Sequence, residues 1–330
     1  MKIQALTRFG DNSIFEITEV PTPEVTSGYV LIRVLATSVN PVDCKLRAGS
    51  FPPITPEFPA VLHGDVAGIV EKVGSGVTEF KVGDEVFGCA GGVKGEGGAL
   101  AEFMLVDARL IAMKPKSLNM REAAALPLVS ITAWEALFEK IKMTSGQKVL
   151  VHGGVGGVGH IAIQLAKWAG ADVYATVSSS EKAELAKSLG AIEAINYRNE
   201  SVQDYTNRIT SGRGFDVVFD TVGGDNIDKS FSAVAQYGNV ITIQAHSTHD
   251  LSILHSKSAS LHVVFMLLPL LCNIQRQRHG DILKRIAELV DKGALKPLVD
   301  LQQFSFENVG KAHALLESGK ALGKVVIHRA

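Results

Sequence analysis

The sequence predicts an α/β protein of two domains, one rich in short strands and one built on a parallel sheet. Its 330 residues are long for one domain and comfortable for two. Strand-like runs punctuated by glycine turns fill about the first 110 residues. From about Ser117 onward, strands alternate with helices, which is the pattern of βαβ units on a parallel sheet.

Three segments of the first domain have strand character. Residues 29–39 are rich in β-branched side chains, and residues 65–77 run into a Gly-Ser-Gly turn. Residues 81–88 alternate apolar and polar side chains around a Gly-Asp turn. Short strands with frequent glycine turns predict a compact, barrel-like β domain.

The second domain opens with a helical segment, 121–140, that Pro127 must break or kink. We then expect strands in 148–153, 171–178, 191–197, 215–224 and 238–245, with a helix after each of the first four.

The end of the chain does not continue this alternation, so we expect it to return to the first domain. It contains an amphipathic helix (280–293), a strand (298–304), a short helix (307–319) and a last strand (323–330). The predicted domains are therefore 1–121 together with 266–330, and 122–265.

Composition and charge restrict the partners that we expect. A hydrophobic fraction of 46 %, a charged fraction of 20 % and a net charge of −1 indicate a globular protein and argue against nucleic-acid binding. The N-terminus lacks the apolar run of a signal peptide. Three scattered cysteines form neither a disulfide framework nor a C-x-x-C pair. We expect a cytoplasmic protein without membrane partners.

The most apolar segment, 261–272, is interrupted by His262 and Pro269. It is shorter than the roughly 20 residues of a membrane span. We expect a buried strand there, followed by an interface or pocket segment.

Residues 152–159, HGGVGGVG, place Gly154, Gly156 and Gly159 in a G-x-G-x-x-G pattern between a strand and a helix. In this context the first glycine permits a tight turn, the second lets the backbone approach a pyrophosphate, and the third lets the helix pack on the strand. The helix N-terminus then attracts the anion. The pattern predicts a dinucleotide site; the alternative is a tight turn without a ligand.

The end of the second strand of this domain indicates which dinucleotide binds. NAD-binding versions carry an acidic residue there, whereas this chain has Ser178, Ser179 and Ser180, with Lys182 close behind. Hydroxyls and a lysine suit a 2′-phosphate, so we expect NADPH. Ser180 could instead only cap the next helix. Tyr197, with the neighbouring Arg198, is expected to close over the same phosphate.

The motifs resemble those of the medium-chain dehydrogenase/reductases, in particular the zinc-independent quinone oxidoreductases (the zeta-crystallin-like group). The resemblance covers essentially the whole chain. It rests on segments 36–49, 63–77, 81–88, 152–159, 195–198, 215–224 and 319–327. It implies a GroES-like β-barrel catalytic domain plus a Rossmann doubly wound parallel-sheet domain, and a homodimer in which residues 261–265 pair across a two-fold axis.

The zinc alcohol dehydrogenases of the same superfamily differ at the metal ligands. Catalytic zinc needs Cys and His ligands with one open position. By the resemblance, the first Cys ligand falls on Asn40 and the ligand His on Gly64, one residue past His63. Residues 128–129 offer no third ligand, and Cys89 stands alone where a structural zinc lobe has four cysteines. We therefore expect no metal, and a packed or turn role for His63.

Without a metal to polarise an alcohol, substrates that are already electron-poor suit the site, such as quinones and α,β-unsaturated carbonyls. The resemblance implies that Asn40 and Lys45 lie near the nicotinamide or the substrate carbonyl. Asn40 and Pro41 could instead only form a turn, and Lys45 could be a solvated charge on the surface. Phe51 stands where the family often has Tyr.

The expected cofactor contacts come from the ends of several elements of the second domain. The complete set is Thr132, Gly154, Val155, Gly156, Gly157, Val158, Gly159, Ser178, Ser179, Lys182, Tyr197, Val222, Gln244, Ala245, Phe265 and Met266, the last two lining the mouth of the site.

The predicted function is an NADPH-dependent, metal-free reductase that transfers hydride to quinones or α,β-unsaturated carbonyls. The alternatives are a zinc-type alcohol dehydrogenase and a non-catalytic, crystallin-like NADPH-binding protein.

Overall fold

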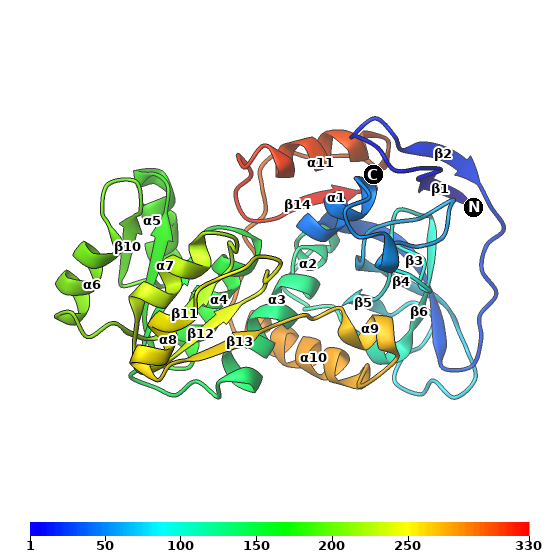
Figure 1. Ribbon diagram of the computed structural model, residues 1–330. Helices are drawn as coiled ribbons and strands as arrows, with labels where there is room; N and C mark the ends of the chain where they lie inside the picture. The colour runs from blue at the N-terminus through cyan, green and yellow to red at the C-terminus, as the bar shows by residue number, and fades with distance from the viewer. Residues whose placement is uncertain (330) are drawn as a thin grey trace. The chain divides into compact units, whose positions relative to one another are not determined.

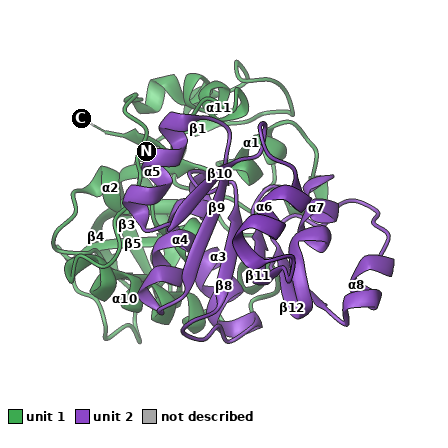
Figure 2. Cartoon of the chain, turned by 90° about the vertical axis from the view of Figure 1, so that its left-hand side faces the viewer, with its two compact units in different colours: residues 1–131, 267–330 green, residues 132–266 purple. Residues whose placement is uncertain are grey.

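The computed structural model describes residues 1–329, which form two compact units (Figure 2). Unit 1 comprises residues 1–131 and 267–329, and unit 2 comprises residues 132–266. The two units divide between residues 131 and 132, whereas the predicted boundary falls between residues 121 and 122. Helix α2 (Met120–Ala124) packs on strands β3 (Tyr29–Val39) and β4 (Asp65–Val73), so it belongs to unit 1.

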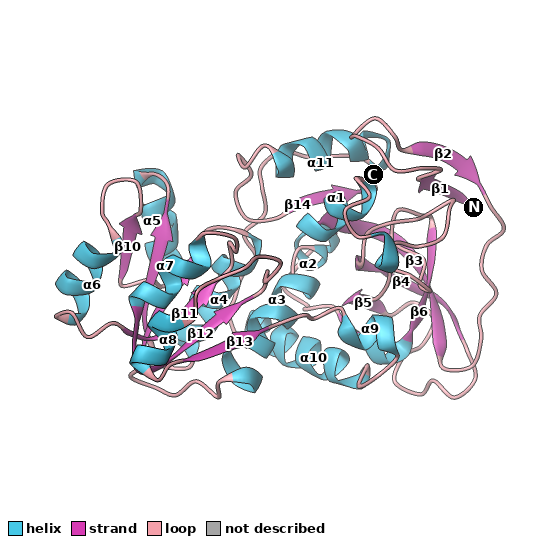
Figure 3. Ribbon diagram, viewed as in Figure 1, coloured by secondary structure: helices cyan, strands magenta, loops and turns pink. Residues whose placement is uncertain are grey.

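Unit 1 is built on an antiparallel sheet in the order β14-β3-β4-β5-β7, with β6 also paired to β3. Figure 3 draws the strands in magenta. Its further strands are β5 (Glu85–Cys89), β6 (Phe103–Asp107), β7 (Ile111–Met113) and β14 (Val325–His328). A separate antiparallel pair is formed by β1 (Lys2–Ala5) and β2 (Glu16–Glu19). The long central strand β3 is almost entirely buried, consistent with its β-branched sequence.

Helices of unit 1 surround this sheet (Figure 1). The unit contains α1 (Pro41–Arg47), α2, α3 (Pro127–Trp134, which ends just past the unit boundary), α9 (Leu268–Cys272), α10 (Gln277–Asp291), α11 (Val309–Glu317) and the short turns η1 (Pro52–Ile54), η2 (Ala108–Leu110) and η4 (Phe306–Asn308). Pro127 interrupts the helical segment as predicted, because it begins a new helix after α2 ends.

Unit 2 contains a six-stranded, all-parallel sheet in the order β10-β9-β8-β11-β12-β13. The strands are β8 (Lys148–His152), β9 (Asp172–Val177), β10 (Glu193–Asn196), β11 (Phe215–Asp220), β12 (Val234–Thr242) and β13 (Ser260–Val263). The chain runs outward from β8 to β10 and then returns beside β8 with β11. This reversal places the loops after β8 and β11 at a topological switch point, where such sheets bind ligands.

The helices of unit 2 cover both faces of its sheet (Figure 2). They are α4 (Gly157–Trp168), α5 (Ser180–Leu189), α6 (Val202–Thr210), α7 (Asn226–Ala233) and α8 (Ser252–Lys257), with the π-helical turn η3 (Glu135–Lys140) at the start. Helices α4 and α5 contact β8, β9 and β10, whereas α7 and α8 contact β11 and β12. A core that includes Leu150, Tyr205, Val218 and Phe231 fills the α6–α8 side.

Two predicted elements differ from the structure. Residues 298–304 form no strand; Val299 and Phe304 make only isolated bridges to Lys324 and Ile327, too few to propagate a ladder. Strand β13 was expected to be buried, but it is the edge of its sheet, and Leu261 and Val263 are 38 % and 45 % exposed. Among residues 1–329, no helix combines the length and the hydropathy that a membrane span requires.

Candidate active site

The glycine-rich loop joins β8 to α4, and its glycines are required for different reasons. Gly154 lies inside the tight turn, which the Gly156 nitrogen closes on the Gly153 oxygen at 2.9 Å, and the positive φ of the turn, +72°, falls on Gly153. A Cβ on Gly154 would lie 2.7 Å from the Cβ of Ala175 on β9. A Cβ on Gly159 would lie 2.2 Å from the carbonyl oxygen of Gly153, so this glycine lets α4 approach the strand end closely, as predicted.

Gly156 differs from these glycines because few protein atoms lie near the position that a Cβ would occupy. A Cβ there would meet one atom, the Gly153 oxygen at 3.2 Å, within 4 Å. Gly156 is also the N-cap of α4, and no side chain among residues 1–329 caps the helix there. The loop therefore offers backbone N–H groups and a helix N-terminus to a ligand, which fits the diphosphate of a dinucleotide. Val155, Gly157 and Val158 complete this loop and the first turn of α4.

Two threonines that the sequence analysis missed hold the start of this loop. The Thr176 hydroxyl accepts a hydrogen bond from the Gly153 nitrogen at 3.3 Å, and the Thr221 hydroxyl donates to the His152 oxygen at 2.6 Å. Their positions at the ends of β9 and β11 were the available signal, because parallel strand ends converge at one edge of the sheet.

The polar residues predicted to read the 2′-phosphate follow β9 and β10. Ser178, Ser179 and Lys182 are partly buried, and Tyr197 is exposed. The Tyr197 nitrogen donates to the Val177 oxygen at 3.2 Å, so the ends of β9 and β10 lie side by side. The helix cap is Ser179, whose hydroxyl accepts from the Lys182 nitrogen, whereas Ser180 is the exposed first residue of α5; the expectation that Ser180 caps the helix is wrong.

The loops after β11 and β12 adjoin, and a buried carboxylate organises the first of them. Asp220 is fully buried and accepts hydrogen bonds from the nitrogens of Val222 at 3.0 Å and Gly223 at 3.1 Å. A Cβ on Gly223 would lie 2.9 Å from the Gln244 Cβ. The predicted contacts Val222 and Gln244 therefore belong to one loop pair. Sequence reasoning missed Asp220, although an acidic residue that ends a buried strand is a recognisable signal.

The remaining residues predicted in unit 2 differ in exposure. Ala245 and Phe265 are exposed, whereas Thr132 is 3 % and Met266 is 5 % exposed. Met266 is thus buried, whereas the neighbouring Phe265 is half-exposed.

In unit 1, Asn40 lies in a buried polar network at the end of β3. It is 1 % exposed, its Nδ2 donates to Asp65 Oδ2 at 2.9 Å, and its Oδ1 accepts from Lys324 Nζ. Ser38 Oγ donates to the same Asp65 oxygen at 2.5 Å. Both ends of the Asn40 amide are therefore held by the protein.

Asn40 precedes α1, which carries Asp43 and Lys45. The Asn40 nitrogen donates to Asp43 Oδ2 at 2.8 Å. Burial, followed by the nearby Asp65, raises the pKa of Asp43 to about 7. Lys45 is half-buried with its ammonium 5.5 Å from the Phe51 ring centroid, and desolvation lowers its pKa.

His63 is buried, has a φ of +72°, and makes its contacts within unit 1. Its Nε2 lies 2.8 Å from His313 Nε2, and its Nδ1 lies 3.3 Å from Thr37 Oγ1. Burial and then the neighbouring His313 lower its pKa. Within residues 1–329, no three His, Cys, Asp or Glu side chains are grouped so that they could hold a metal ion. Asn40 and Gly64, which stand at the ligand positions that the family resemblance implies, lack the thiolate and imidazole donors that a catalytic zinc needs.

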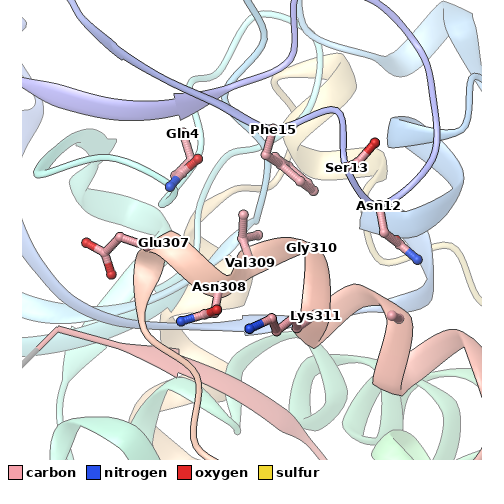
Figure 4. Close-up of a pocket in the computed structure, with 10 residues that line it drawn as sticks. Gln4, Asn12, Ser13, Phe15, Glu307, Asn308, Val309, Gly310 and Lys311 are labelled. Atoms are coloured by element: carbon pink, nitrogen blue, oxygen red, sulfur yellow. The ribbon is translucent and has the colours of Figure 1, made fainter.

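A pocket of about 400 Å³ in unit 1 contains none of the predicted site residues. Figure 4 shows Asn12, Ser13 and Phe15 facing the start of α11, where Val309 and Lys311 lie. Its polar side chains lie around the start of α11, which no side chain among the described residues caps. None of the described residues that line the pocket has a buried side-chain atom without a hydrogen-bond partner.

Family comparisons agree with this geometry. The protein-family model described as "Alcohol dehydrogenase GroES-like domain" matches residues 26–116. The family model described as "Zinc-binding dehydrogenase" matches residues 189–327. The 2-methylene-furan-3-one reductase of Solanum lycopersicum is 39 % identical, with 99 % of this chain and 79 % of that protein aligned. The chain belongs to the medium-chain dehydrogenase/reductases, in their quinone oxidoreductase group.

Two further curated members are similar over nearly the whole chain. The chloroplastic NADPH-dependent alkenal/one oxidoreductase of Arabidopsis thaliana is 35 % identical over 99 % of this chain and 79 % of its own length. The quinone oxidoreductase of Rattus norvegicus is 30 % identical over 99 % of this chain and 97 % of its own.

Solved structures of this family have the same fold. An alcohol dehydrogenase superfamily protein from Novosphingobium aromaticivorans superposes with a TM-score of 0.95 at 41 % identity, with 100 % of both chains covered. The Escherichia coli quinone oxidoreductase complexed with NADPH has a TM-score of 0.89 at 27 % identity, also with 100 % of both chains covered. The expected GroES-like and Rossmann domains are thereby confirmed.

Proposed function

We propose that this protein is an NADPH-dependent reductase that transfers hydride to quinones or α,β-unsaturated carbonyls without a metal. The observation that carries the proposal is the open glycine turn at Gly156, at the switch point of a parallel sheet, in a chain of the quinone oxidoreductase group. The names of the tomato, Arabidopsis and rat relatives support the two substrate classes.

The cofactor would be held by unit 2. The N-terminus of α4 would bind the diphosphate, and Ser178, Ser179, Lys182 and Tyr197 would surround the 2′-phosphate. Strand β9 ends without a carboxylate that would repel this phosphate. An NADPH-complexed member of the group supports the choice of NADPH over NADH.

When NADPH is bound, it supplies the hydride. The chain's own task is then to stabilise the negative charge that develops on the acceptor oxygen and to deliver a proton there. Lys45 suits this task because desolvation lowers the pKa of its ammonium, which makes it a better acid than an ordinary lysine. We assign Asn40 the role of fixing the start of α1, which carries Lys45, because its amide is held by Asp65 and Lys324.

Zinc independence is part of the proposal. An alcohol substrate would need a metal to become an alkoxide, whereas a conjugated acceptor spreads the incoming charge to its own oxygen. The residues at the two ligand positions, Asn40 and Gly64, support the metal-free alternative.

We also propose a homodimer and a cytoplasmic location. The edge strand β13 exposes Leu261 and Val263, and Phe265 beyond it is 49 % exposed. An exposed apolar edge is a template for pairing with a second chain, which supports the dimer. Free cysteines at positions 44, 89 and 272 suit a reducing compartment.

Stopped-flow oxidation of NADPH against a panel of quinones and enones, repeated with NADH, tests the function. We expect rapid turnover with conjugated acceptors and a clear preference for NADPH. Tight NADPH binding without turnover across the panel would support a non-catalytic, crystallin-like role. A preference for NADH would overturn the assignment of the serines and Lys182.

A further inference from the structure

The carboxylate of Asp65 makes hydrogen bonds to two separate helices. Asp65 begins β4 and is fully buried. Its Oδ2 accepts from Asn40 Nδ2 at 2.9 Å, and its Oδ1 accepts from the Leu128 nitrogen at 2.8 Å. One side chain therefore joins the start of α1 to the start of α3.

These two helices carry residues of the proposed reductase site. Helix α1 begins directly after Asn40 and carries Lys45 one turn later. Helix α3 begins at Pro127, which has no N–H, so Leu128 presents the first N–H of the helix to the carboxylate. An anion at a helix N-terminus is stabilising. Thr132, one of the predicted cofactor contacts, follows one turn later on α3.

Lys324 compensates the buried charge of Asp65. It is 2 % exposed and lies directly before β14, with its Nζ 3.5 Å from Asp65 Oδ2 and 3.2 Å from the Val39 oxygen. The same ammonium donates to Asn40 Oδ1. Because Lys324 requires the amide oxygen and Asp65 requires the amide nitrogen, the Asn40 side chain has one orientation.

We infer that Asp65 and Lys324 are a pair of positioning residues, which fixes α1 and α3 together and so sets the places of Lys45 and Thr132. This inference rests on the proposed function for its catalytic consequence. Neither residue touches the reacting atoms in this assignment, and both act through helices that do carry site residues.

Three isosteric or near-isosteric variants separate positioning from a purely structural role. Lys324→Met removes the ammonium, and Asp65→Asn removes the carboxylate charge. Thr37→Val is the matched control, because the Thr37 hydroxyl donates to the backbone oxygen of Asp65 at 2.6 Å and does not reach either helix. For each variant, kcat is measured per NADPH-binding site, counted by fluorescence titration, alongside the NADPH dissociation constant and the melting temperature.

We expect Lys324→Met to lower kcat per site by about tenfold or more, because small displacements of positioned groups are costly to catalysis. Asp65→Asn should lower kcat similarly and also weaken NADPH binding, because it loosens α3. Thr37→Val should lower the melting temperature while kcat per site stays within about twofold of wild type. Lys324→Arg, which keeps the charge, should recover most of the lost kcat.

If Lys324→Met does not fold, the doubly neutral variant Asp65→Asn/Lys324→Met replaces it, because no unpaired charge is then buried. A kcat per site within about twofold of wild type in either variant overturns the inference, as does an equal loss in Thr37→Val. If the wild-type protein binds NADPH but reduces no acceptor, the proposed function fails. The inference is then decided by whether Asp65→Asn weakens NADPH binding while Thr37→Val does not.

Discussion

Among single residues, the glycines of the glycine-rich loop are required for different reasons although they are the same residue type. Gly153 is needed for its positive φ, and Gly159 for the close approach of the Gly153 carbonyl. A Cβ on Gly156 would meet only the Gly153 oxygen at 3.2 Å, a much milder contact than the 2.2 Å at Gly159, so the fold itself requires a glycine there far less. A ligand that approaches the backbone does account for this glycine.

The first prediction uses this difference between Gly156 and Gly159. Gly156→Ala should weaken NADPH binding by about tenfold or more while the melting temperature changes little, because its Cβ would occupy the cofactor's space. Gly159→Ala should destabilise the protein by about 1–3 kcal/mol, because its Cβ would overlap the Gly153 oxygen. Isothermal titration with NADPH and thermal denaturation check both. A large loss of stability in Gly156→Ala with unchanged affinity would contradict this account.

The second prediction concerns the pH dependence of stability. Burial raises the pKa of Asp43 from 3.8 to about 7, so between these values the folded protein holds a proton that the unfolded chain releases. The stability that the protonated Asp43 gives to the folded protein is fully present below pH 3.8, and it is lost as the pH rises through 7. Between pH 5 and pH 8, the wild type should lose about 2 kcal/mol more unfolding free energy than Asp43→Asn. Urea denaturation at both pH values measures this; parallel curves for the two proteins would refute it.

Among the secondary-structure elements, β13 is exposed because it lies at the edge of the parallel sheet. The apolar run 261–272 predicts burial, yet β13 pairs on one side only, with β12. Periodicity identifies a strand but not its place in the sheet order, because the side chains of an edge strand and a central strand can be equally apolar.

The third prediction tests what covers this edge. Val263→Asp should shift the protein from dimer to monomer, because a charge on an apolar edge strand opposes pairing. Sedimentation velocity at micromolar concentration provides the measurement. Thr248→Asp, in an exposed loop, serves as the charge-matched control and should leave the oligomeric state unchanged. A wild-type protein that sediments as a monomer would remove the basis for the proposed dimer.

At the scale of the whole molecule, the chain combines two units whose site residues come from segments far apart in sequence. In unit 1, Asn40, Asp65 and Lys324 meet although up to 284 residues separate them. In unit 2, the ends of β8, β9, β11 and β12 bring the loop residues to one edge of the sheet. Asn40 and Gly64, which stand at the zinc-ligand positions that the family resemblance implies, both lie in unit 1.

The fourth prediction follows from those residues. The purified protein should contain far less than one zinc per chain, and its reductase activity should survive dialysis against EDTA, because Asn40 and Gly64 cannot replace Cys and His as ligands. Elemental analysis combined with assays before and after chelation decides this. One bound zinc per chain, with activity lost to the chelator, would establish the zinc-type alcohol dehydrogenase alternative.

The β-rich first region, the alternating strands and helices of the second, the glycine loop and the family could all be predicted from the sequence, because strand and helix periodicities and the G-x-G-x-x-G spacing are local properties. The sequence also placed most helices and strands correctly, including the break at Pro127. Contacts in the folded chain were needed to show that the positive φ falls on Gly153, that Ser179 caps α5, that β13 is an exposed edge and that residues 298–304 form no strand. The tertiary structure also revealed Asp65, Lys324 and Asp220, because buried partners meet through contacts between distant segments, and no local pattern encodes such contacts.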